Sequence, residues 1–411
     1  MQAKTCGGWF FFTQPARATR ALRTAAVLCC LLAGTSMPAA AQIAFQVQAA
    51  MATGPFPLTL AVGDFNGDGN PDLAVTMQGN NRVYIYTGNG NGTFSFAISY
   101  VVGSQPTGIV AVDLNHDGKL DLAISNRQDN SVSILLGHGN GTFTAAVAYP
   151  VGPLPGPIIA GSFNPDGYTD LVTANTGDVC GPPFSPCGSV TLLRNHGDGT
   201  FYTGATLYPQ DVPSQIATGV FSASGESDIV VTSATSNEFR VFQGDGGGGF
   251  PVTHGPFATL SASAVVVADF NGDGKSDIAI SRASYGDISL QHGNGDGTFQ
   301  SAQIYSEGAA GANAYAAAIG DFDGDGFPDL ALANYTDNSV AVLHNRTIGN
   351  GGFYGPLTLS GGVTSPSAIA IADFNRDGKP DIVVVNSGSN SLTVFLNTSI
   401  PTDIIFANGF E

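Results

Sequence analysis

DFNGDGNPD, residues 64–72, is the first of five copies of one acidic nine-residue pattern, and the other four are Asp113–Asp121 (DLNHDGKLD), Asp269–Asp277 (DFNGDGKSD), Asp321–Asp329 (DFDGDGFPD) and Asp373–Asp381 (DFNRDGKPD). Two eroded copies lie between the second and third of these, at Ser162–Asp170 (SFNPDGYTD) and Val220–Asp228 (VFSASGESD). The seven loops start 49, 49, 58, 49, 52 and 52 residues apart. A repeat of this length is typical of a propeller, a solenoid or an array.

Each repeat is predicted to contain four short strands. In the second repeat the strands are expected at Thr107–Val112, Leu122–Ser125, Ser131–Leu136 and Thr142–Val151. These runs are rich in Val, Ile, Leu and Phe, are separated by Gly, Asn and Asp, and show no helical periodicity. We therefore expect an all-β fold in which every repeat is a four-stranded antiparallel meander.

A glycine-rich turn follows the third predicted strand of six repeats, and a phenylalanine comes soon after each turn: Phe94, Phe143, Phe201, Phe250, Phe299 and Phe353. Asn-Gly and Asp-Gly pairs suit the positive φ angles of tight hairpins. A phenylalanine at a fixed offset can fill the space between adjacent sheets. His138, His196 and His292 fall in or beside these turns, and we interpret them as turn residues and not as ligands.

The two ends of the repeat region complement each other. The last repeat ends after its third predicted strand, Leu392–Asn397, with no glycine turn and no fourth strand. Ile43–Ala50 resembles the missing strand in its spacing from the repeat that follows. If it completes the final sheet, the ring closes and no long sheet edge is left exposed. We therefore predict a seven-bladed β-propeller over residues 42–399, with four-stranded antiparallel blades, closed by the N-terminal strand.

The acidic loops carry oxygen ligands at alternate positions. In the first loop Asp64, Asn66 and Asp68 occupy positions 1, 3 and 5, Gly69 permits the sharp bend, and Asp72 closes the set at position 9. Calcium prefers about six to eight oxygen ligands, and the backbone carbonyl at position 7 can add one more. The start of the loop resembles an EF-hand, but position 12 is not glutamate and the flanking segments are predicted strands. The pattern therefore predicts a calcium site outside the EF-hand class.

The loop pattern resembles D-x-[DN]-x-D-G-x-x-D, the repeat of the FG-GAP and VCBS family, whose best-known fold is the seven-bladed propeller of integrin α subunits. The resemblance covers nearly the whole chain after residue 42. It implies calcium ligands at positions 1, 3, 5, 7 and 9 of the five intact loops: Asp64, Asn66, Asp68, Asn70 and Asp72; Asp113, Asn115, Asp117, Lys119 and Asp121; Asp269, Asn271, Asp273, Lys275 and Asp277; Asp321, Asp323, Asp325, Phe327 and Asp329; Asp373, Asn375, Asp377, Lys379 and Asp381. Position 7 contributes its backbone carbonyl in each.

The two eroded loops depart from this pattern. The third loop has Ser162 at position 1 but keeps Asn164, Asp166 and Asp170, which implies a weaker metal site. The fourth loop has lost its acidic side chains at positions 1, 3 and 5 and is not expected to bind. We expect about five calcium ions, with the third loop as the candidate for a sixth, weaker one.

The chain is acidic, with 32 Asp and Glu against 14 Lys and Arg and a formal net charge of −18. More than half of the acidic residues lie in the seven loops. Concentrated in tight turns, carboxylates repel one another unless cations neutralise them. The acidic balance also argues against nucleic acid or an anionic membrane as a partner. We expect a monomer with no nucleic-acid partner.

The first 41 residues have the layout of a secretory signal peptide. Arg17, Arg20 and Arg23 precede the apolar run Ala25–Gly34, and small residues follow at 39–41. The run is too short for a stable anchor, and no later run reaches the roughly 18 apolar residues of a membrane span. We therefore expect an exported bacterial protein, periplasmic, on the cell surface or released, with no transmembrane segment. The tail at residues 400–411 lies outside the repeat and carries a candidate sorting signal.

Two cysteines follow the signal peptide, Cys180 and Cys187, in the sequence CGPPFSPC. Because an exported protein meets oxidising conditions, we predict a disulfide that closes this short loop, with a free pair as the alternative. The loop belongs to an insertion at Thr176–Gly188, expected on the face opposite the acidic loops. Its prolines and Phe184 make it a candidate contact point for a partner, and a loop pinned only for protease resistance is the other interpretation.

Metal loops of this kind account for stability, so function is expected elsewhere on the scaffold. The resemblance implies an integrin-like, non-catalytic binding or adhesion module that holds a protein or glycan on the face opposite the calcium loops. The alternative is a calcium-dependent polysaccharide-degrading enzyme, a lyase or a hydrolase, because some calcium-dependent propellers cleave acidic polysaccharides. Such an enzyme needs clustered basic residues, whereas those of this chain are scattered, and neither G-x-S-x-G nor H-E-x-x-H occurs. We expect the binding module, with no catalytic residues.

Overall fold

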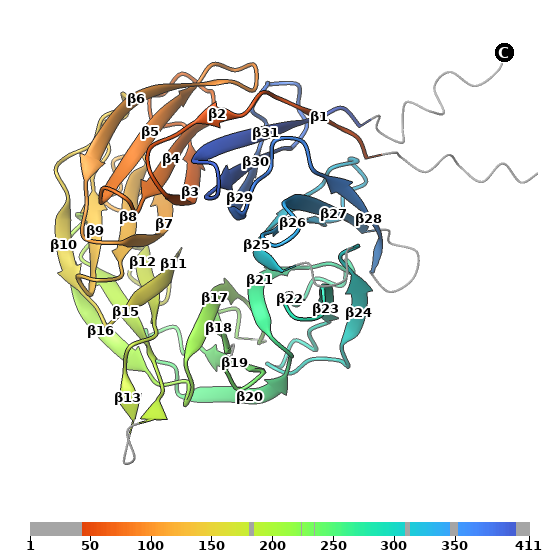
Figure 1. The fold of residues 1–411 in the computed structure, drawn as a ribbon. Helices are drawn as coiled ribbons and strands as arrows, with labels where there is room; N and C mark the ends of the chain where they lie inside the picture. The colour runs from red at the N-terminus through yellow and green to blue at the C-terminus, as the bar shows by residue number, and fades with distance from the viewer. Residues whose placement is uncertain are drawn as a thin grey trace, which may run out of the picture. The chain divides into compact units, whose positions relative to one another are not determined.

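The structure, a computed structural model, describes residues 43–180, 185–222, 224–233, 235–308, 313–345 and 352–399. In this part of the chain seven antiparallel sheets are arranged around a common axis as the blades of a propeller (Figure 1). The predicted all-β, seven-bladed fold is confirmed. The predicted signal peptide and the tail at 400–411 lie outside the described residues, so both stay predictions.

The blades are numbered in chain order, and their strands are as follows. Blade 1 contains β3 (Pro57–Gly63), β4 (Asp72–Met77), β5 (Arg82–Gly88) and β6 (Phe94–Val101); blade 2, β7 (Pro106–Val112), β8 (Asp121–Asn126), β9 (Ser131–Leu135) and β10 (Val147–Pro150); blade 3, β11 (Pro155–Gly161), β12 (Asp170–Asn175), β15 (Ser189–Asn195) and β16 (Phe201–Leu207); blade 4, β17 (Pro213–Gly219), β18 (Asp228–Ser233), β19 (Glu238–Gln243) and β20 (Val252–Ala258). Blade 5 contains β21 (Ala262–Ala268), β22 (Asp277–Arg282), β23 (Asp287–Gln291) and β24 (Gln303–Ser306); blade 6, β25 (Ala314–Gly320), β26 (Asp329–Asn334), β27 (Ser339–Asn345) and β28 (Phe353–Leu359); blade 7, β29 (Pro366–Ala372), β30 (Asp381–Asn386) and β31 (Ser391–Asn397), joined by β1 (Phe45–Val47) and β2 (Met51–Ala52).

The first strand of each blade lies innermost. These strands contact their counterparts in the neighbouring blades all the way round the ring, where β29 of blade 7 meets β3 of blade 1. The second strand is buried over nearly its whole length, whereas the fourth, outermost strand is largely exposed. The core is divided between blades, and each apolar cluster joins the facing sides of two neighbours. Near-continuous apolar runs in the second strands are what this burial on both faces requires.

The phenylalanine at position 2 of an acidic loop packs between two blades. Phe65 and Phe270 are fully buried, and each meets edge-on the phenylalanine that follows the next blade's glycine turn. The ring centroids are 5.5 Å apart for Phe65 and Phe143, and 5.4 Å apart for Phe270 and Phe353. Edge-to-face pairs at this separation add to the free energy gained from burial alone. The predicted role of the glycine-turn phenylalanines in filling the space between sheets is confirmed.

The N-terminal strand completes the last blade, as predicted. Strand β1 pairs antiparallel with β31, with Phe45 opposite Asn397, and β2 extends the same edge (Figure 1). The Phe45 ring lies 5.4 Å from that of Phe322 in an edge-on contact. Phe45 therefore takes in blade 7 the place that a glycine-turn phenylalanine takes in other blades.

The outer strand of blade 2 is shorter than predicted. It begins at Val147 and not at Thr142. Before Val147, the pairing with the third strand is reduced to an isolated bridge between Gly137 and Phe143. The reason is the inward turn of Phe143, whose backbone N–H donates to the Tyr100 hydroxyl and whose ring packs against Phe65.

The predicted insertion forms a short hairpin, β13 (Val179–Cys180) and β14 (Ser185–Pro186), at the outside of blade 3 (Figure 1). Cys187 is buried and disulfide-bonded. Phe184 and the side chain of Cys180 lie outside the described residues, so the pairing of the two cysteines stays a prediction.

An asparagine in the turn between the second and third strands joins several blades to the next one. These asparagines have positive φ, and their Oδ1 atoms accept backbone N–H groups of the following blade: Asn81 from Gln105, Asn130 from Leu154, Asn237 from Ser261, Asn338 from Ser365 and Asn390 from Phe56. Asparagine tolerates this left-handed conformation better than most residues. The Asn390 bond, 2.8 Å long, fastens the last blade to the first.

Candidate metal centres

The seven acidic loops each connect the first and second strands of a blade, so all of them lie at one end of the propeller. In the first loop Asp64 Oδ1 accepts the Gly67 N–H at 2.7 Å, and Asp64 Oδ2 accepts the Gly69 N–H at 2.8 Å. Asn66 Oδ1 accepts the Asp68 N–H at 2.8 Å. The positive φ of Gly69, 80°, permits this tight winding. The backbone therefore holds the oxygen atoms of positions 1 and 3 within one turn.

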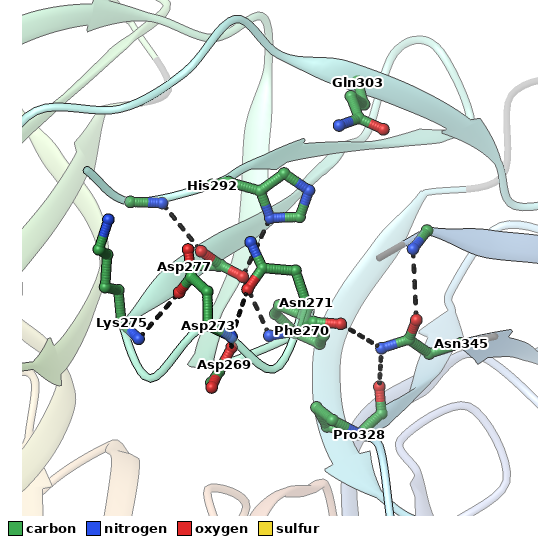
Figure 2. A network of polar contacts seen from close by, with 12 residues as sticks. Asp269, Phe270, Asn271, Asp273, Lys275, Asp277, His292, Gln303, Pro328 and Asn345 are labelled. Carbon is green, nitrogen blue, oxygen red and sulfur yellow. Dashed lines mark hydrogen bonds and ion pairs between the residues drawn. The ribbon is translucent and has the colours of Figure 1, made fainter. Parts of the chain in front are cut away.

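The fifth loop repeats the same bonds (Figure 2). The Asp273 N–H donates to Asn271 Oδ1 at 2.9 Å, and the Gly274 N–H donates to Asp269 Oδ2 at 2.7 Å. The Lys275 N–H donates to Asp273 Oδ1 at 3.0 Å, which fixes position 5 as well. Corresponding bonds occur in the second, sixth and seventh loops. The five intact loops thus share one geometry.

Position 9 is buried in all seven loops and has a structural role of its own. Asp72 Oδ2 accepts the Phe65 N–H at 3.0 Å, and its Oδ1 accepts the Gly88 N–H at 2.8 Å, which ties the loop to the end of the third strand. Burial raises the pKa of Asp329 to about 7 and the pKa of Asp170 and of Asp381 to about 6. Each carboxylate oxygen has a further lone pair, so these bonds leave the capacity to ligate a cation.

The loops also hold neighbouring blades together. Asn345 of blade 6 donates from Nδ2 to the Phe270 carbonyl of the fifth loop at 2.8 Å and to the Pro328 carbonyl of its own loop at 3.2 Å (Figure 2). Asn397 makes the corresponding bond to Phe322, and Gly92 donates from its backbone to Phe374. Order in one acidic loop is therefore coupled to the position of the next blade.

The donor sets of the intact loops fit a hard divalent cation. Asp113 Oδ1, at position 1 of the second loop, is buried and has no hydrogen-bond partner among the described residues. In the sixth loop a carboxylate oxygen from each of Asp321, Asp323 and Asp329 lies within 4.8 Å of the others. Calcium takes oxygen ligands of this kind, and the buried, mutually repelling carboxylates gain most from a bound cation.

The eroded loops differ as their sequences imply. In the third loop the Ser162 hydroxyl donates to the Asn164 carbonyl at 3.2 Å, where the five intact loops have a carboxylate. In the fourth loop the hydroxyls of Ser222 and Ser224 bond to each other at 2.7 Å. Asp228 nevertheless keeps both bonds of position 9.

Two histidines approach the acidic loops from the third strand or its end. His292 is buried, and its Nδ1 lies 3.0 Å from Asp277 Oδ2 (Figure 2). His344 Nε2 lies 2.6 Å from Asp323 Oδ2. His292 lies beside its glycine turn, as expected, but its side chain is buried against the acidic loop, whereas His138 and His196 are exposed in their turns. An alignment of the repeats finds the signal, because His292 and His344 occupy the same position of successive blades.

The opposite end of the propeller contains a hollow on the axis. A cavity of about 480 Å³ is lined by residues near the start of the inner strands, among them Thr107, Gln215 and Tyr315, and by Arg127. A second cavity of about 330 Å³, lined by Ser261, Asn313 and Tyr315 among others, adjoins it. The Tyr315 and Tyr335 rings lie 4.7 Å apart here, and both are exposed. This face therefore offers an aromatic surface beside polar groups.

A family model for FG-GAP-like repeats matches residues 64–124, 113–173, 221–280, 269–332 and 321–384. The chain belongs to the FG-GAP-like repeat family. The matched segments span five of the loop-to-loop units, and both eroded loops fall at least partly within them. No curated protein matches the chain. The part of this FG-GAP propeller that the structure describes has no helix long and apolar enough to cross a membrane.

Solved structures similar to the FG-GAP propeller share its fold at low sequence identity. BBS1N in complex with ARL6DN is 12% identical, covering 86% of this chain and 96% of that one, with a TM-score of 0.60. An Agrocybe aegerita lectin that recognises non-reducing terminal N-acetylglucosamine is 17% identical, covering 85% and 87%, with a TM-score of 0.53. A catalytically inactive virginiamycin B lyase from Staphylococcus aureus with quinupristin is 14% identical, covering 86% and 99%, with a TM-score of 0.56. Propellers of this shape thus include protein-binding, glycan-binding and enzymatic members.

Proposed function

We propose that this FG-GAP propeller is an exported, calcium-binding module that binds a protein or glycan without catalysis. It acts as a monomer, and its ligand lies on the face opposite the acidic loops. The observation that carries the proposal is the exposed pair Tyr315 and Tyr335 beside the two cavities of that face.

Calcium binding is proposed for the five intact loops. The side chains at positions 1, 3, 5 and 9 and the carbonyl at position 7 would hold the ion, which would neutralise a carboxylate cluster whose member at position 9 is buried. The support comes from the shared winding of these loops and from the buried Asp113 Oδ1, which has no hydrogen-bond partner in the described part of the chain. Because the loops also bond to the next blade, the ion would stabilise the ring and leave the ligand face to other residues.

The ligand face supplies both contact surface and specificity. Tyr315 is 49% exposed and Tyr335 is 37% exposed, so their faces are available to a sugar ring or an apolar side chain. Rigid aromatic side chains lose little entropy on binding and dominate many binding surfaces. Gln215, Ser263 and Asn313 line the adjoining cavity and can hydrogen-bond hydroxyl groups of a ligand. This combination suits a glycan or a polar peptide.

The test is ligand capture with and without the tyrosine pair. A glycan array and a pull-down from the cell envelope are carried out with the full chain and with the Tyr315→Ala, Tyr335→Ala double variant. The control is Tyr354→Ala on the outer strand β28 of the same blade, because Tyr354 is also 49% exposed. We expect the double variant to lose roughly tenfold or more of the retained ligand and the control to keep it. Equal retention by the two variants contradicts the proposal.

The alternative, a calcium-dependent polysaccharide-degrading enzyme, has less support. Arg127 is the basic side chain among the described residues that line the central cavity, and its Nη2 donates to Thr176 Oγ1 at 3.3 Å. Binding an acidic polysaccharide in a catalytic site requires several basic side chains. A polysaccharide lyase and hydrolase assay in calcium distinguishes the two functions, since release of reducing ends would favour the enzyme.

A further inference from the structure

The sixth blade brings an imidazole into its acidic loop. His344 lies near the end of β27, and its Nε2 is 2.6 Å from Asp323 Oδ2. Both side chains are largely buried, with exposed fractions of 12% for His344 and 2% for Asp323. A donor atom from each of Asp323, Asp325 and His344 lies within 4.8 Å of the others. The contact therefore belongs to a compact group of one nitrogen and two carboxylate ligands.

Two features occur together only in this blade, a histidine near the end of the third strand and an aspartate at position 3 of the loop. The position of His344 is occupied by Thr87, Leu136, Arg194, Gln243, His292 and Leu396 in the other blades. Position 3 of the loop is aspartate in the sixth blade alone, where the others have asparagine or serine. The additional carboxylate and the imidazole are the two groups that contact each other. His292, in the fifth blade, meets Asp277 at position 9 through Nδ1 and not a residue at position 3.

Imidazole nitrogen is a poor ligand for calcium, which takes oxygen ligands, and a good one for zinc and the later first-row transition metals. We propose that the sixth blade binds a transition-metal dication of the zinc type through His344 Nε2, Asp323 and Asp325, while the other intact loops take calcium. The inference rests on the proposed metal binding by the acidic loops, and it changes the identity of the ion at one of them.

The surroundings give such an ion access to the solvent. A cavity of about 350 Å³ lies against the loop and is lined by Asp321, Asp323 and Gly324 from blade 6 and by Gly378, Lys379 and Ser399 from blade 7. Lys379 Nζ donates to the Ser399 carbonyl at 2.7 Å, which directs its ammonium group to this carbonyl. An ion held by three protein ligands beside a cavity can complete its coordination with water.

The experiment uses the metal-free full chain and Co²⁺ as a spectroscopic probe. One equivalent of Co²⁺ is expected to produce visible ligand-field bands, which Zn²⁺ abolishes and an equal concentration of Ca²⁺ leaves unchanged. His344→Gln and Asp323→Asn are expected to weaken Co²⁺ and Zn²⁺ binding by about tenfold or more. The control His292→Gln, which removes the histidine at the same position of blade 5, is expected to keep the spectrum. Circular dichroism melting curves verify that each variant is folded.

Three results overturn the inference. They are an unchanged Co²⁺ spectrum in His344→Gln, displacement of Co²⁺ by Ca²⁺ as readily as by Zn²⁺, and a gain of calcium affinity in His344→Gln, which would make the imidazole an internal counterion. Calcium uptake by equilibrium dialysis keeps the two proposals distinct. If the full chain takes up no calcium, the calcium proposal is contradicted. The cobalt result alone decides whether the sixth blade binds a zinc-type ion.

Discussion

The backbone N–H of Gly244 donates to Asp228 Oδ1 at 2.9 Å in the one blade whose acidic loop has no carboxylate at positions 1, 3 and 5. The other oxygen of Asp228 accepts the Phe221 N–H at 2.9 Å. The same pair of bonds occurs at Asp72 in an intact loop. Position 9 therefore stabilises the blade whether or not its loop has the other ligands for a metal.

Asp228→Asn is expected to lower the free energy of unfolding by about 1 to 3 kcal/mol, because the new amide group faces one buried N–H with a donor in place of an acceptor. The loss is independent of calcium, since the fourth loop has no ligand set. Chemical denaturation with and without calcium measures it. Asp64→Asn is the comparison, and its loss is expected mainly in calcium. A calcium-dependent loss in Asp228→Asn would contradict the structural role.

Glu307 makes the stability fall as the pH rises. Its side chain is buried, Oε1 accepts the Ser281 hydroxyl at 2.6 Å, and Oε2 has no hydrogen-bond partner among the described residues. Burial raises the pKa of Glu307 to about 8, and Asp287 and Asp337 add to the effect. The folded protein therefore holds a proton that the unfolded chain releases near its ordinary pKa of 4.5. The contribution of protonated Glu307 to the free energy of unfolding is complete below about pH 4.5, and it is lost progressively as the pH rises to about 8.

Glu307→Gln is expected to remove that loss. At pH 8.5 the variant should be more stable than the parent by a few kcal/mol, at most about 5. At pH 4.5 the two should be nearly equal. Denaturant titrations at the two pH values measure the difference, and Glu226→Gln, which alters an exposed acid, is the control. A pH-independent difference between Glu307→Gln and the parent would contradict the explanation.

Phe45→Ala tests the closure of the ring. The ring of Phe45 is partly buried against Phe322, and its strand covers the edge of β31. We expect the variant to lose about 2 kcal/mol, less than a fully buried phenylalanine would cost. Val47→Ala in the same strand is the control, because Val47 is exposed. Equal melting temperatures for the Phe45 variant and the parent would exclude an energetic role for this contact.

Asn390→Ala tests the bond that fastens blade 7 to blade 1. The variant loses the 2.8 Å hydrogen bond to the Phe56 N–H and places alanine at a φ of 50°. A loss of about 1 to 2 kcal/mol is expected. Asn390→Gly also removes the hydrogen bond, but glycine adopts the positive φ without strain. The two variants therefore separate the contribution of the hydrogen bond from that of backbone strain. If the glycine variant is as stable as the parent, the hydrogen bond contributes nothing.

The sequence was sufficient for the architecture because its signals are local and repeated. The acidic loops, the glycine turns and the unpaired strand at Ile43–Ala50 each follow from a short pattern at a fixed period. The contacts of His344 with Asp323 and of Asn390 with Phe56 were not predicted, since the first depends on strand register and the second joins residues 334 positions apart. The late start of the outer strand of blade 2 was not predicted either, because it depends on contacts between blades. Phe143 donates to the Tyr100 hydroxyl and packs against Phe65, both in the neighbouring blade.

The oxygen-bearing side chains at positions 1, 3 and 5 were predicted from residue type, and the structure adds how the backbone holds them, while calcium binding by these side chains stays a proposal. The burial of position 9 was not predicted, because the pattern of an intact loop cannot separate a metal ligand from a structural acceptor. The comparison with Asp228 provides that separation.

The most direct test of the account is thermal unfolding of the full chain in millimolar calcium and in excess EGTA. At a free calcium about ten times the dissociation constant, each site contributes roughly 1.4 kcal/mol to the folded state. Four or five sites should therefore raise the melting temperature by roughly 10 °C, and calcium added back after EGTA should restore it. An unchanged melting curve in EGTA would contradict the proposal that these loops bind calcium.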